Sequence, residues 1–502
     1  MKTQPMAHQE VGRARLDAKP EYFAIGAEQG TGKTWMLLDE AERRHEAKDI
    51  NGLLVVAPKG VHSNWVRREI PTHLEAPHRA EYYVSGGGVL RERRVARLMK
   101  PSGELDILTI NFDALNSKKG YAVAREFLAS HKAIMDVDES ARIKTPGAAR
   151  TKNCRNLGKL ARARRIASGT MITNSPMDLF SQFEFLKPGG NLLGTTSHTA
   201  FMAEYAQLLP PTHDLVEYLI ESNPRLRKMR SHDGVFRRLE ALPKIIEKDK
   251  HGRPIYRNLD KLHKLLQPNM YRVLKRDCLD LPDKIYQTRY FELTPSQRRV
   301  YQQAKKEFIY ERDTGQIDRF TALTKIGKLR QITSGFIMLD GQPTSLPAEG
   351  NPRMELMEEL IEDIGEGQQF IIWAYYHEEI NNLVKLLEKM GISIVQYHGQ
   401  ITSDKEREAA VDDFQAGNAQ CFIGNQDTGG IGLTLTAAEI VFFYSNDYAY
   451  DKREQAEDRS HRIGTTEHVL YVDLVGADTI DEDIAAAQQS KADVASAILD
   501  GV

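Results

Sequence analysis

The chain has 502 residues, of which 41% are hydrophobic and 27% charged, and its formal net charge is −2. This length predicts two or three domains of soluble globular composition, and the near-neutral charge confines any nucleic-acid binding to local patches. The three cysteines, Cys154, Cys278 and Cys421, form no close pair, which argues against zinc modules and disulfides and favours a reducing compartment. No apolar run approaches membrane-spanning length, so we expect a cytoplasmic protein.

The first distinctive stretch is AEQGTGKT at residues 27–34, between an apolar run and a helix-like segment. Such a strand, loop and helix can cradle phosphate, because Gly30 and Gly32 let backbone N–H groups turn inward and the helix N-terminus adds its positive dipole. We expect Lys33 to reach the β- and γ-phosphates of a nucleotide and the Thr34 hydroxyl to ligate Mg²⁺. The full eight-residue pattern begins with glycine, and alanine stands there in this chain. Partner motifs must therefore decide whether the loop is functional.

From about residue 23 to 190, short apolar runs alternate with charged, helix-like segments, and a second block of this kind follows residue 350. Continuous apolar runs separated by helices predict a parallel sheet with both faces covered. The expected strands are residues 53–57, 107–110 and 133–137 in the first block and 370–373, 392–395, 421–424, 440–443 and 469–472 in the second.

The stretch between these blocks has a different composition. It is rich in Lys and Arg, has few β-branched runs, and reads as helices broken by prolines. The expected domains are lobe 1 at residues 1–190, a helical basic insertion at 191–285, a helical linker at 286–350 and lobe 2 at 351–502.

Two carboxylates, Asp138 and Glu139, follow the third expected strand. Open α/β sheets bind their ligands at this end of the strands. We expect Asp138 to hold Mg²⁺ and Glu139 to act as general base toward water. The alternative is an acidic strand end that only caps the next helix, but the phosphate loop upstream favours catalysis.

Two arginines, Arg459 and Arg462, are three residues apart and therefore share one face of a helix in the second block. Both guanidinium groups can face a γ-phosphate held by the first block. The alternative is an exposed helix with surface salt bridges.

The order of these motifs resembles that of the superfamily 2 helicase-like ATPases, and specifically the Swi/Snf-type branch of DNA translocases. The likeness extends over nearly the whole chain and is weakest from residue 191 to 270. The segment LKRDCLDLPDK, residues 274–284, resembles the branch's connection between the lobes. The motifs lie at residues 27–34 (I), 54–65 (Ia), 138–144 (II), 168–174 (III), 370–373 (IV), 428–438 (V) and 455–464 (VI).

This resemblance implies an α/β fold of two RecA-like parallel-sheet lobes with a helical insertion between them, and it implies ATP and Mg²⁺ as cofactors. Three positions depart from the family pattern: Ala141 replaces a histidine, Met171 a proline and Thr465 a glutamine. The first change puts the coupling of hydrolysis to DNA binding in doubt. The nucleotide-binding residues implied are Gln9, which would read adenine, and Gln29, Gly30, Thr31, Gly32, Lys33, Thr34, Gly432 and Gln455.

DNA contacts should be mainly to phosphates, because a translocase must not depend on sequence. A basic stretch at residues 225–238 is a further candidate, with a solvated helix face as its alternative. Trp65, Trp373 and Tyr375 lie next to apolar strands and are expected in the core more than as stacking platforms. The expected DNA-contacting residues are Lys59, Ser63, Asn64, Asn111, Thr428 and Gly429.

The leading hypothesis is an ATP-dependent motor on double-stranded DNA that remodels branched DNA or protein–DNA complexes. Its compact size suits the cytoplasm of a bacterium or a phage host, and a protein loading partner is left open. One alternative is a helicase that separates DNA or RNA strands. Another is an inactive ATP-binding scaffold, against which the intact Lys33, Asp138 and Arg459 argue.

Overall fold

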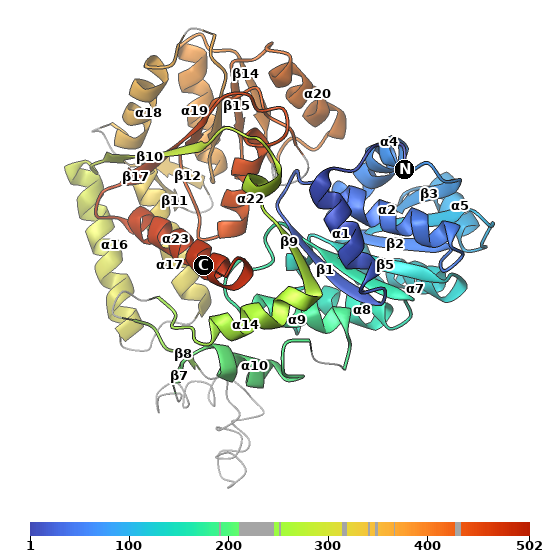
Figure 1. Ribbon diagram of the computed structural model, residues 1–502. Helices are drawn as coiled ribbons and strands as arrows, with labels where there is room; N and C mark the ends of the chain where they lie inside the picture. Colours follow the sequence, from blue (N-terminus) through green and yellow to red (C-terminus); the bar gives the residue numbers. More distant parts are fainter. Residues whose placement is uncertain are drawn as a thin grey trace.

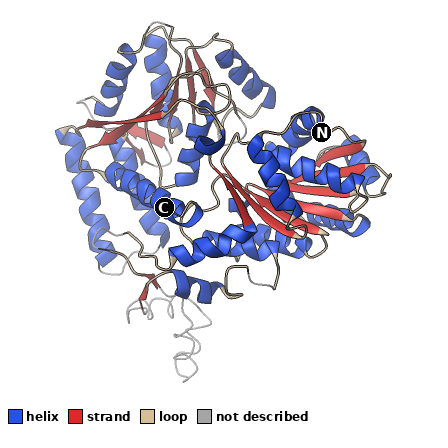
Figure 2. Ribbon diagram, in the orientation of Figure 1, coloured by secondary structure: helices blue, strands red, loops and turns tan. Residues whose placement is uncertain are grey.

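Two α/β lobes make up this computed structural model, with the first lobe in blue to cyan and the second in orange to red (Figure 1). Red strands lie inside each lobe and blue helices lie around them (Figure 2). In the part of the chain that is described, no helix is long and apolar enough to cross a membrane. The structure describes residues 1–189, 192–209, 245–249, 253–313, 319–339, 342–346, 350–365, 367–426 and 433–501.

The first lobe is built on a seven-stranded sheet in the order β3-β4-β2-β5-β6-β1-β9, and every pairing in it is parallel. Strands β2, β4 and β5 are buried at every residue, as their continuous apolar sequences predict. The strands are β1 (Tyr22–Ala27), β2 (Gly52–Ala57), β3 (His78–Tyr83), β4 (Leu105–Asn111), β5 (Ala133–Asp138), β6 (Ala163–Ala167) and β9 (Met270–Val273).

Helices cover both faces of this sheet, which buries two separate apolar layers. One layer lies under α1 (Ala7–Asp17), α2 (Lys33–Glu46), α3 (Val61–Asn64), η1 (Trp65–Glu69) and α4 (Ile70–His73). The other lies under α5 (Val89–Leu98), α6 (Phe112–Asn116), α7 (Lys118–Ser130), η2 (Ser140–Ile143), α8 (Ala149–Gly158), α9 (Asp178–Leu186), α10 (His198–Tyr205) and α14 (Leu259–Leu266).

The second lobe has a six-stranded parallel sheet in the order β10-β17-β16-β13-β15-β14. Helices α18 and α19 pack on one face, and α20 and α22 on the other. The elements are β10 (Lys284–Phe291), β13 (Phe370–Trp373), β14 (Ile394–Tyr397), β15 (Cys421–Gly424), β16 (Ile440–Phe443), β17 (Val469–Gly476), α18 (Pro352–Glu362), α19 (His377–Lys389), α20 (Asp404–Gln415) and α22 (Tyr450–Ser460). These two parallel sheets confirm the expected fold class.

The connection between the lobes contains strands that the sequence did not predict. Strand β9 pairs with β1, and after α15 (Lys275–Cys278) strand β10 pairs with β17. Both strands begin within residues 191–285, where a helical insertion was expected, and β10 continues into the expected helical linker. Neither strand carries a local signal for a partner that lies far away in the chain. The domain boundaries themselves stay a prediction. The remaining elements are β7 (Leu208–Leu209), β8 (Ile245–Ile246), η3 (Gln267–Asn269), α16 (Pro295–Asp313), α17 (Arg319–Thr333), β11 (Phe336–Leu339) and β12 (Gln342–Ser345).

The C-terminal helix α23 (Ile480–Leu499) contacts both lobes. Its first turns, at Ile480 and Ile484, pack against α16, α17 and the end of β10. Its last turns, at Ile498 and Leu499, belong to the apolar core of the first lobe, where the helix ends beside α14 (Figure 1). The helix therefore ties the lobes together independently of the chain crossing at residues 274–283.

Candidate nucleotide site

The strand register places the expected motifs at one edge of the first sheet. Asp138, at the end of β5, lies opposite Ala167 at the end of β6. Ala167 also lies opposite Ile25 of β1, the strand that enters the phosphate loop. Because all three strands run parallel, the segments that follow them converge at the carboxyl edge of the sheet.

The phosphate loop has the backbone conformation that its glycines permit. Gly30 and Gly32 have φ angles of 85° and 80°, which side-chain-bearing residues rarely adopt. Helix α2 begins directly after them, so its first N–H groups point toward the loop. The Lys33 ammonium lies within this loop and donates hydrogen bonds to the carbonyls of Ala27 (2.8 Å) and Glu28 (3.2 Å).

Gln9 lies against the phosphate loop, although it precedes that loop in the chain and belongs to a different helix, α1. It is only 4% exposed, and its side-chain amide occupies the space that a Cβ at Gly32 would fill. Its Oε1 accepts a hydrogen bond from the Met6 backbone N–H (2.9 Å), and a ring nitrogen of His8 bonds the Thr31 carbonyl (2.7 Å). The N-terminal helix is therefore fastened to the phosphate loop, and the adenine-reading role of Gln9 stays a prediction.

The two carboxylates after β5 have different surroundings. Asp138 is buried and accepts a hydrogen bond from the indole Nε1 of Trp65 (3.1 Å). Glu139 has a φ of 53°, an uncommon backbone conformation for this residue type that is typical of functional turns, and accepts a hydrogen bond from the Ser168 hydroxyl (3.2 Å). Burial raises the pKa of Asp138 to about 6, the neighbouring Glu139 charge adds to this, and the Lys33 charge opposes it.

This pKa predicts that Mg²⁺–nucleotide affinity falls at acidic pH. The Asp138 carboxyl takes up a proton as the pH drops through about 6, and a protonated carboxyl is a poor metal ligand, so affinity should fall by up to about tenfold per pH unit below that value. Tryptophan fluorescence, to which Trp65 beside Asp138 contributes, can follow a titration with Mg²⁺ and ADP at several pH values. The Asp138→Asn variant should show only the nucleotide's own titration; an equal pH dependence in both proteins would contradict the assignment.

Arg459 is buried and Arg462 is half-buried, which does not fit the alternative of an exposed salt-bridged helix. Arg459, near the end of α22, is 2% exposed, and its Nε and Nη2 make no hydrogen bond to any described residue. Burial lowers its pKa to about 10, the Arg462 charge adds to this, and the Asp458 and Glu139 charges oppose it. Arg459 therefore stays cationic at neutral pH and lies within electrostatic range of Glu139.

Arg462 approaches the phosphate loop itself. A Cβ added at Gly30 would lie 3.6 Å from the Cβ of Arg462. Its Nη1 donates to the Leu433 carbonyl (2.9 Å), so it is already partly bonded. Both arginines thus belong to the part of the second lobe that meets the first lobe's site. Gln455 lies one turn before Arg459 on α22.

The residues present fit ATP and Mg²⁺. A buried charged side chain is normally paired, so the free donors of Arg459 suit an anionic ligand. The glycine loop, Lys33 and the start of α2 offer donors to phosphates, while Thr34 and Asp138 offer the oxygen ligands that Mg²⁺ prefers.

The expected DNA-contacting residues that the structure describes lie after strand β2 and at the end of strand β4 in the first sheet. Lys59 follows β2 and is exposed. The Ser63 hydroxyl donates to the Gly60 carbonyl (2.8 Å), and the Asn64 amide donates to Glu69 (3.4 Å). Asn111 is 8% exposed and its amide oxygen caps α6, so this side chain is already used structurally. Thr428, Gly429, Gly432 and the basic stretch 225–238 lie outside the described residues.

Of the three aromatic residues expected in the core, two are buried there. Trp65 and Trp373 are 1% and 0% exposed, whereas Tyr375 is half-buried and the Arg330 guanidinium stacks on its ring at 3.9 Å.

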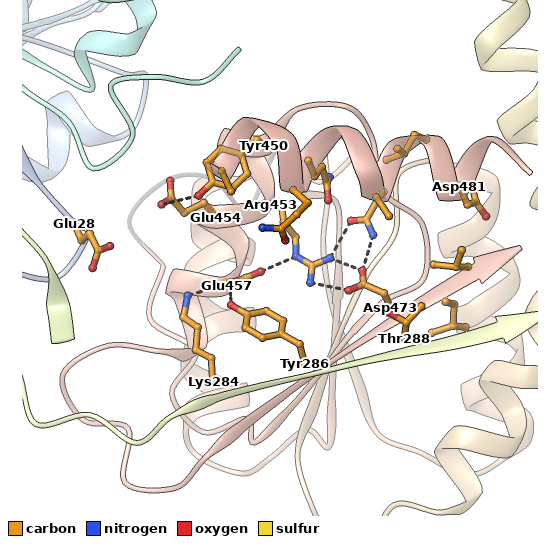
Figure 3. A pocket seen from close by; sticks show the side chains of 18 residues that line it. Glu28, Lys284, Tyr286, Thr288, Tyr450, Arg453, Glu454, Glu457, Asp473 and Asp481 are labelled. Atoms are coloured by element: carbon orange, nitrogen blue, oxygen red, sulfur yellow. Dashed lines mark hydrogen bonds and ion pairs between the residues drawn. The ribbon is translucent and has the colours of Figure 1, made fainter. Parts of the chain in front are cut away.

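Other contacts between the lobes were not predicted. The Thr170 hydroxyl, after β6, donates to Glu454 of α22. A polar cavity of about 540 Å³ lies beside this contact, with Glu28 on one side and Lys284, Glu454 and Glu457 on the other (Figure 3). Thr170 belongs to motif III, so the sequence could indicate this residue. It could not indicate its partner Glu454, which is 284 residues away.

Comparison with known proteins gives the family. Residues 24–335 match the SNF2-related domain and residues 352–464 the helicase conserved C-terminal domain. YwqA of Bacillus subtilis, named as a proposed ATP-dependent helicase/translocase, is 27% identical over 480 residues, covering 93% of this chain and 45% of YwqA. The zebrafish (Danio rerio) chromodomain-helicase-DNA-binding protein 1-like is 23% identical over 476 residues, covering 93% of this chain and 41% of that protein.

The chain therefore spans less than half the length of these two relatives. Among solved structures, the Sulfolobus solfataricus SWI2/SNF2 ATPase core in complex with dsDNA is 21% identical, covers 99% of this chain and 94% of its own, and has a TM-score of 0.40. The SNF2-related domain alone matches well over half of the 502 residues. The chain belongs to the SNF2-related family of helicase-like proteins.

Proposed function

We propose that this protein hydrolyses ATP between its two lobes and uses the reaction to move along double-stranded DNA, remodelling branched DNA or protein–DNA complexes. The observation that carries the proposal is Arg459, a buried arginine of the second lobe that has two nitrogens without a hydrogen bond to the described residues and lies within electrostatic range of Glu139. An arginine delivered across a nucleotide site stabilises the charge that develops on a transferred phosphoryl group.

The other site residues take complementary roles. Lys33 and the loop N–H groups would hold the phosphates, while Thr34 and Asp138 would hold Mg²⁺. When bound, Mg²⁺ supplies positive charge that offsets the charge on the phosphates. Glu139 would orient and deprotonate water, and the Ser168 hydroxyl keeps its carboxylate in place at 3.2 Å.

Movement would follow from the way the lobes are joined. The Thr170–Glu454 bond connects motif III with the arginine helix, so a change at the nucleotide can alter how the lobes meet. Lys59 and the backbone around Asn64 would contact DNA phosphates, which carry no sequence information. The names of two relatives support this reading, since YwqA is named as a helicase/translocase and the zebrafish relative as DNA-binding.

We further propose that the protein acts in the cytoplasm of a bacterium or phage host, with bacterial relatives as the support, and that a separate protein loads it onto DNA. Capture of a partner from such a cell on immobilised, DNA-bound protein would test the second point.

ATP turnover measured with different nucleic acids tests the proposed motor. We expect duplex DNA to stimulate turnover more than single-stranded DNA or RNA does, because duplex tracking needs contacts to a double-stranded backbone. Displacement of a strand from a forked duplex would favour the strand-separating helicase instead. Equal turnover with and without every nucleic acid would reject the motor, and no turnover at all would favour a scaffold.

A further inference from the structure

Lys275 lies where the chain leaves the first lobe, next to the phosphate loop. It is the first residue of α15, directly after the β9 segment that pairs with β1. Its backbone N–H donates to the Glu28 carboxylate at 2.7 Å, and the Glu28 N–H donates to the Val273 carbonyl at 3.0 Å. Glu28 is the second residue of the phosphate loop, so these two bonds fix the Lys275 backbone to the loop.

The side chain of Lys275 reaches into the second lobe. Its ammonium donates to Asp458 Oδ1 at 2.5 Å and to the His461 carbonyl at 2.6 Å. These two residues directly precede Arg459 and Arg462 in the chain. One ammonium group therefore bonds a side chain next to Arg459 and a backbone carbonyl next to Arg462. Lys275 as a whole is 4% exposed.

We propose that Lys275 is a positioning residue that sets the placement of Arg459 and Arg462 relative to the phosphate loop. The inference rests on the proposed ATP hydrolysis and adds a residue that would act through the two arginines. Lysines buried to this extent are kept only when paired, and losing one partner leaves the other charge buried and unsatisfied. Without the Lys275 ammonium, the end of α22 should shift, and a displacement of about 1 Å in a reacting group can slow a reaction by about 10².

Other contacts hold the lobes together without Lys275. Arg272 donates to Asp500 at 2.7 Å, and Lys491 of α23 donates to Asn174 at 3.1 Å. Removal of the Lys275 side chain should therefore leave the lobes attached through α23. The expected effect is a less fixed placement of α22, and of the lobe that carries it, against the phosphate loop, without separation of the lobes.

Lys284 provides a matched control. It lies on β10 and donates to Glu457 of the same helix at 3.0 Å (Figure 3), with Asp458 at 3.7 Å. All of these partners belong to the second lobe. Lys275→Met and Lys284→Met thus each remove one lysine that bonds α22. Only the first separates α22 from a residue whose backbone is bonded to the phosphate loop.

The kinetic test compares catalysis with nucleotide binding. We expect Lys275→Met to lower kcat at saturating ATP and DNA by about tenfold or more, and to change the dissociation constant of a fluorescent ADP analogue by only about twofold. Lys275→Arg should recover part of the loss, since a guanidinium can donate to both Asp458 and the His461 carbonyl. A weakened ADP affinity with unchanged kcat would overturn the proposal.

A second test reads the geometry without using activity. Spin labels at Glu46→Cys in α2 and Glu388→Cys in α19, in a Cys278→Ser background, report the distance between the lobes. Lys275→Met should broaden and shift this distribution when Mg²⁺ and ADP are present, and Lys284→Met should keep that of the parent. Identical distance distributions for the parent protein and both variants would overturn the proposal. Because this test does not use activity, it remains valid if the protein shows no ATP turnover. That result would reject the proposed function but not the positioning role of Lys275.

A double-variant cycle tests whether Lys275 acts through Asp458. Asp458→Asn should lose activity like Lys275→Met, and the double variant should lose no more than the worse single one, because residues acting as a unit are not additive. Multiplied losses would show that Lys275 acts elsewhere. If Lys275→Met does not fold, Asp458→Asn and Lys275→Arg carry the same comparison.

Discussion

Replacing Glu139 with glutamine is expected to abolish rapid turnover while nucleotide binding persists. Glutamine keeps the length of the side chain and can still accept the Ser168 hydrogen bond, but it cannot take a proton from water. We expect the rate of ATP hydrolysis to fall by a factor of about 10² or more, with the dissociation constant of ATP unchanged within about threefold. Single-turnover hydrolysis and equilibrium binding of ATP measure the two quantities.

The same substitution has a second expected effect, on pH dependence. The Glu139 charge is one cause of the raised pKa of Asp138, so its removal should shift the acidic loss of Mg²⁺–ADP affinity to lower pH. Glu126→Gln, at an exposed position of α7 in the same lobe, is the control and should behave as the parent protein. Normal hydrolysis by Glu139→Gln would show that the general base has been misassigned.

Replacing Arg459 with alanine is expected to have the larger effect on the chemical step. Its guanidinium is buried, stays charged at neutral pH, and keeps two nitrogens without a hydrogen bond to the described residues. An arginine that stabilises phosphoryl-transfer charge contributes about 10³-fold or more to the rate, so the variant should lose about that much. ATP hydrolysis at saturating nucleotide and DNA is the measurement.

Lysine at position 459 should rescue little, because an ammonium cannot reproduce the planar fork of donors. Arg299→Ala removes an exposed arginine of α16 and should leave turnover unchanged. If Arg459→Ala hydrolyses ATP at the parent rate while Arg462→Ala does not, the arginine that stabilises the transferred phosphoryl group is Arg462, whose Cβ lies 3.6 Å from a Cβ added at Gly30.

Much of the site could be predicted because its signals are local in the chain. The apolar runs at residues 53–57, 107–110 and 133–137 form β2, β4 and β5, and each is a strand buried on both faces. Motif chemistry follows directly from such strands, since a loop or carboxylate after a parallel strand lies at the ligand-binding edge. The expected strand at 392–395 starts two residues later in the structure, at Ile394, because strand ends depend on pairing.

The contacts between distant segments could not be predicted in this way. Helix α23 reads locally as an ordinary helix at the end of the second lobe, yet its last turns complete the core of the first. Thr170 lies in motif III, yet its hydroxyl donates to Glu454, which is 284 residues away. In each case the local pattern is correct and the partner that determines the role is elsewhere.

The sequence by itself determined the two parallel sheets, the phosphate loop and the residue types that face a nucleotide, because hydrophobic periodicity and loop chemistry act over a few neighbouring residues. Only the tertiary structure decided which groups meet across the lobes: Arg459 with the edge that carries Glu139, and Lys275 with both Glu28 and Asp458. Such meetings depend on the packing of whole lobes, and burial makes each of those charges dependent on a partner that no nearby residue of the chain provides.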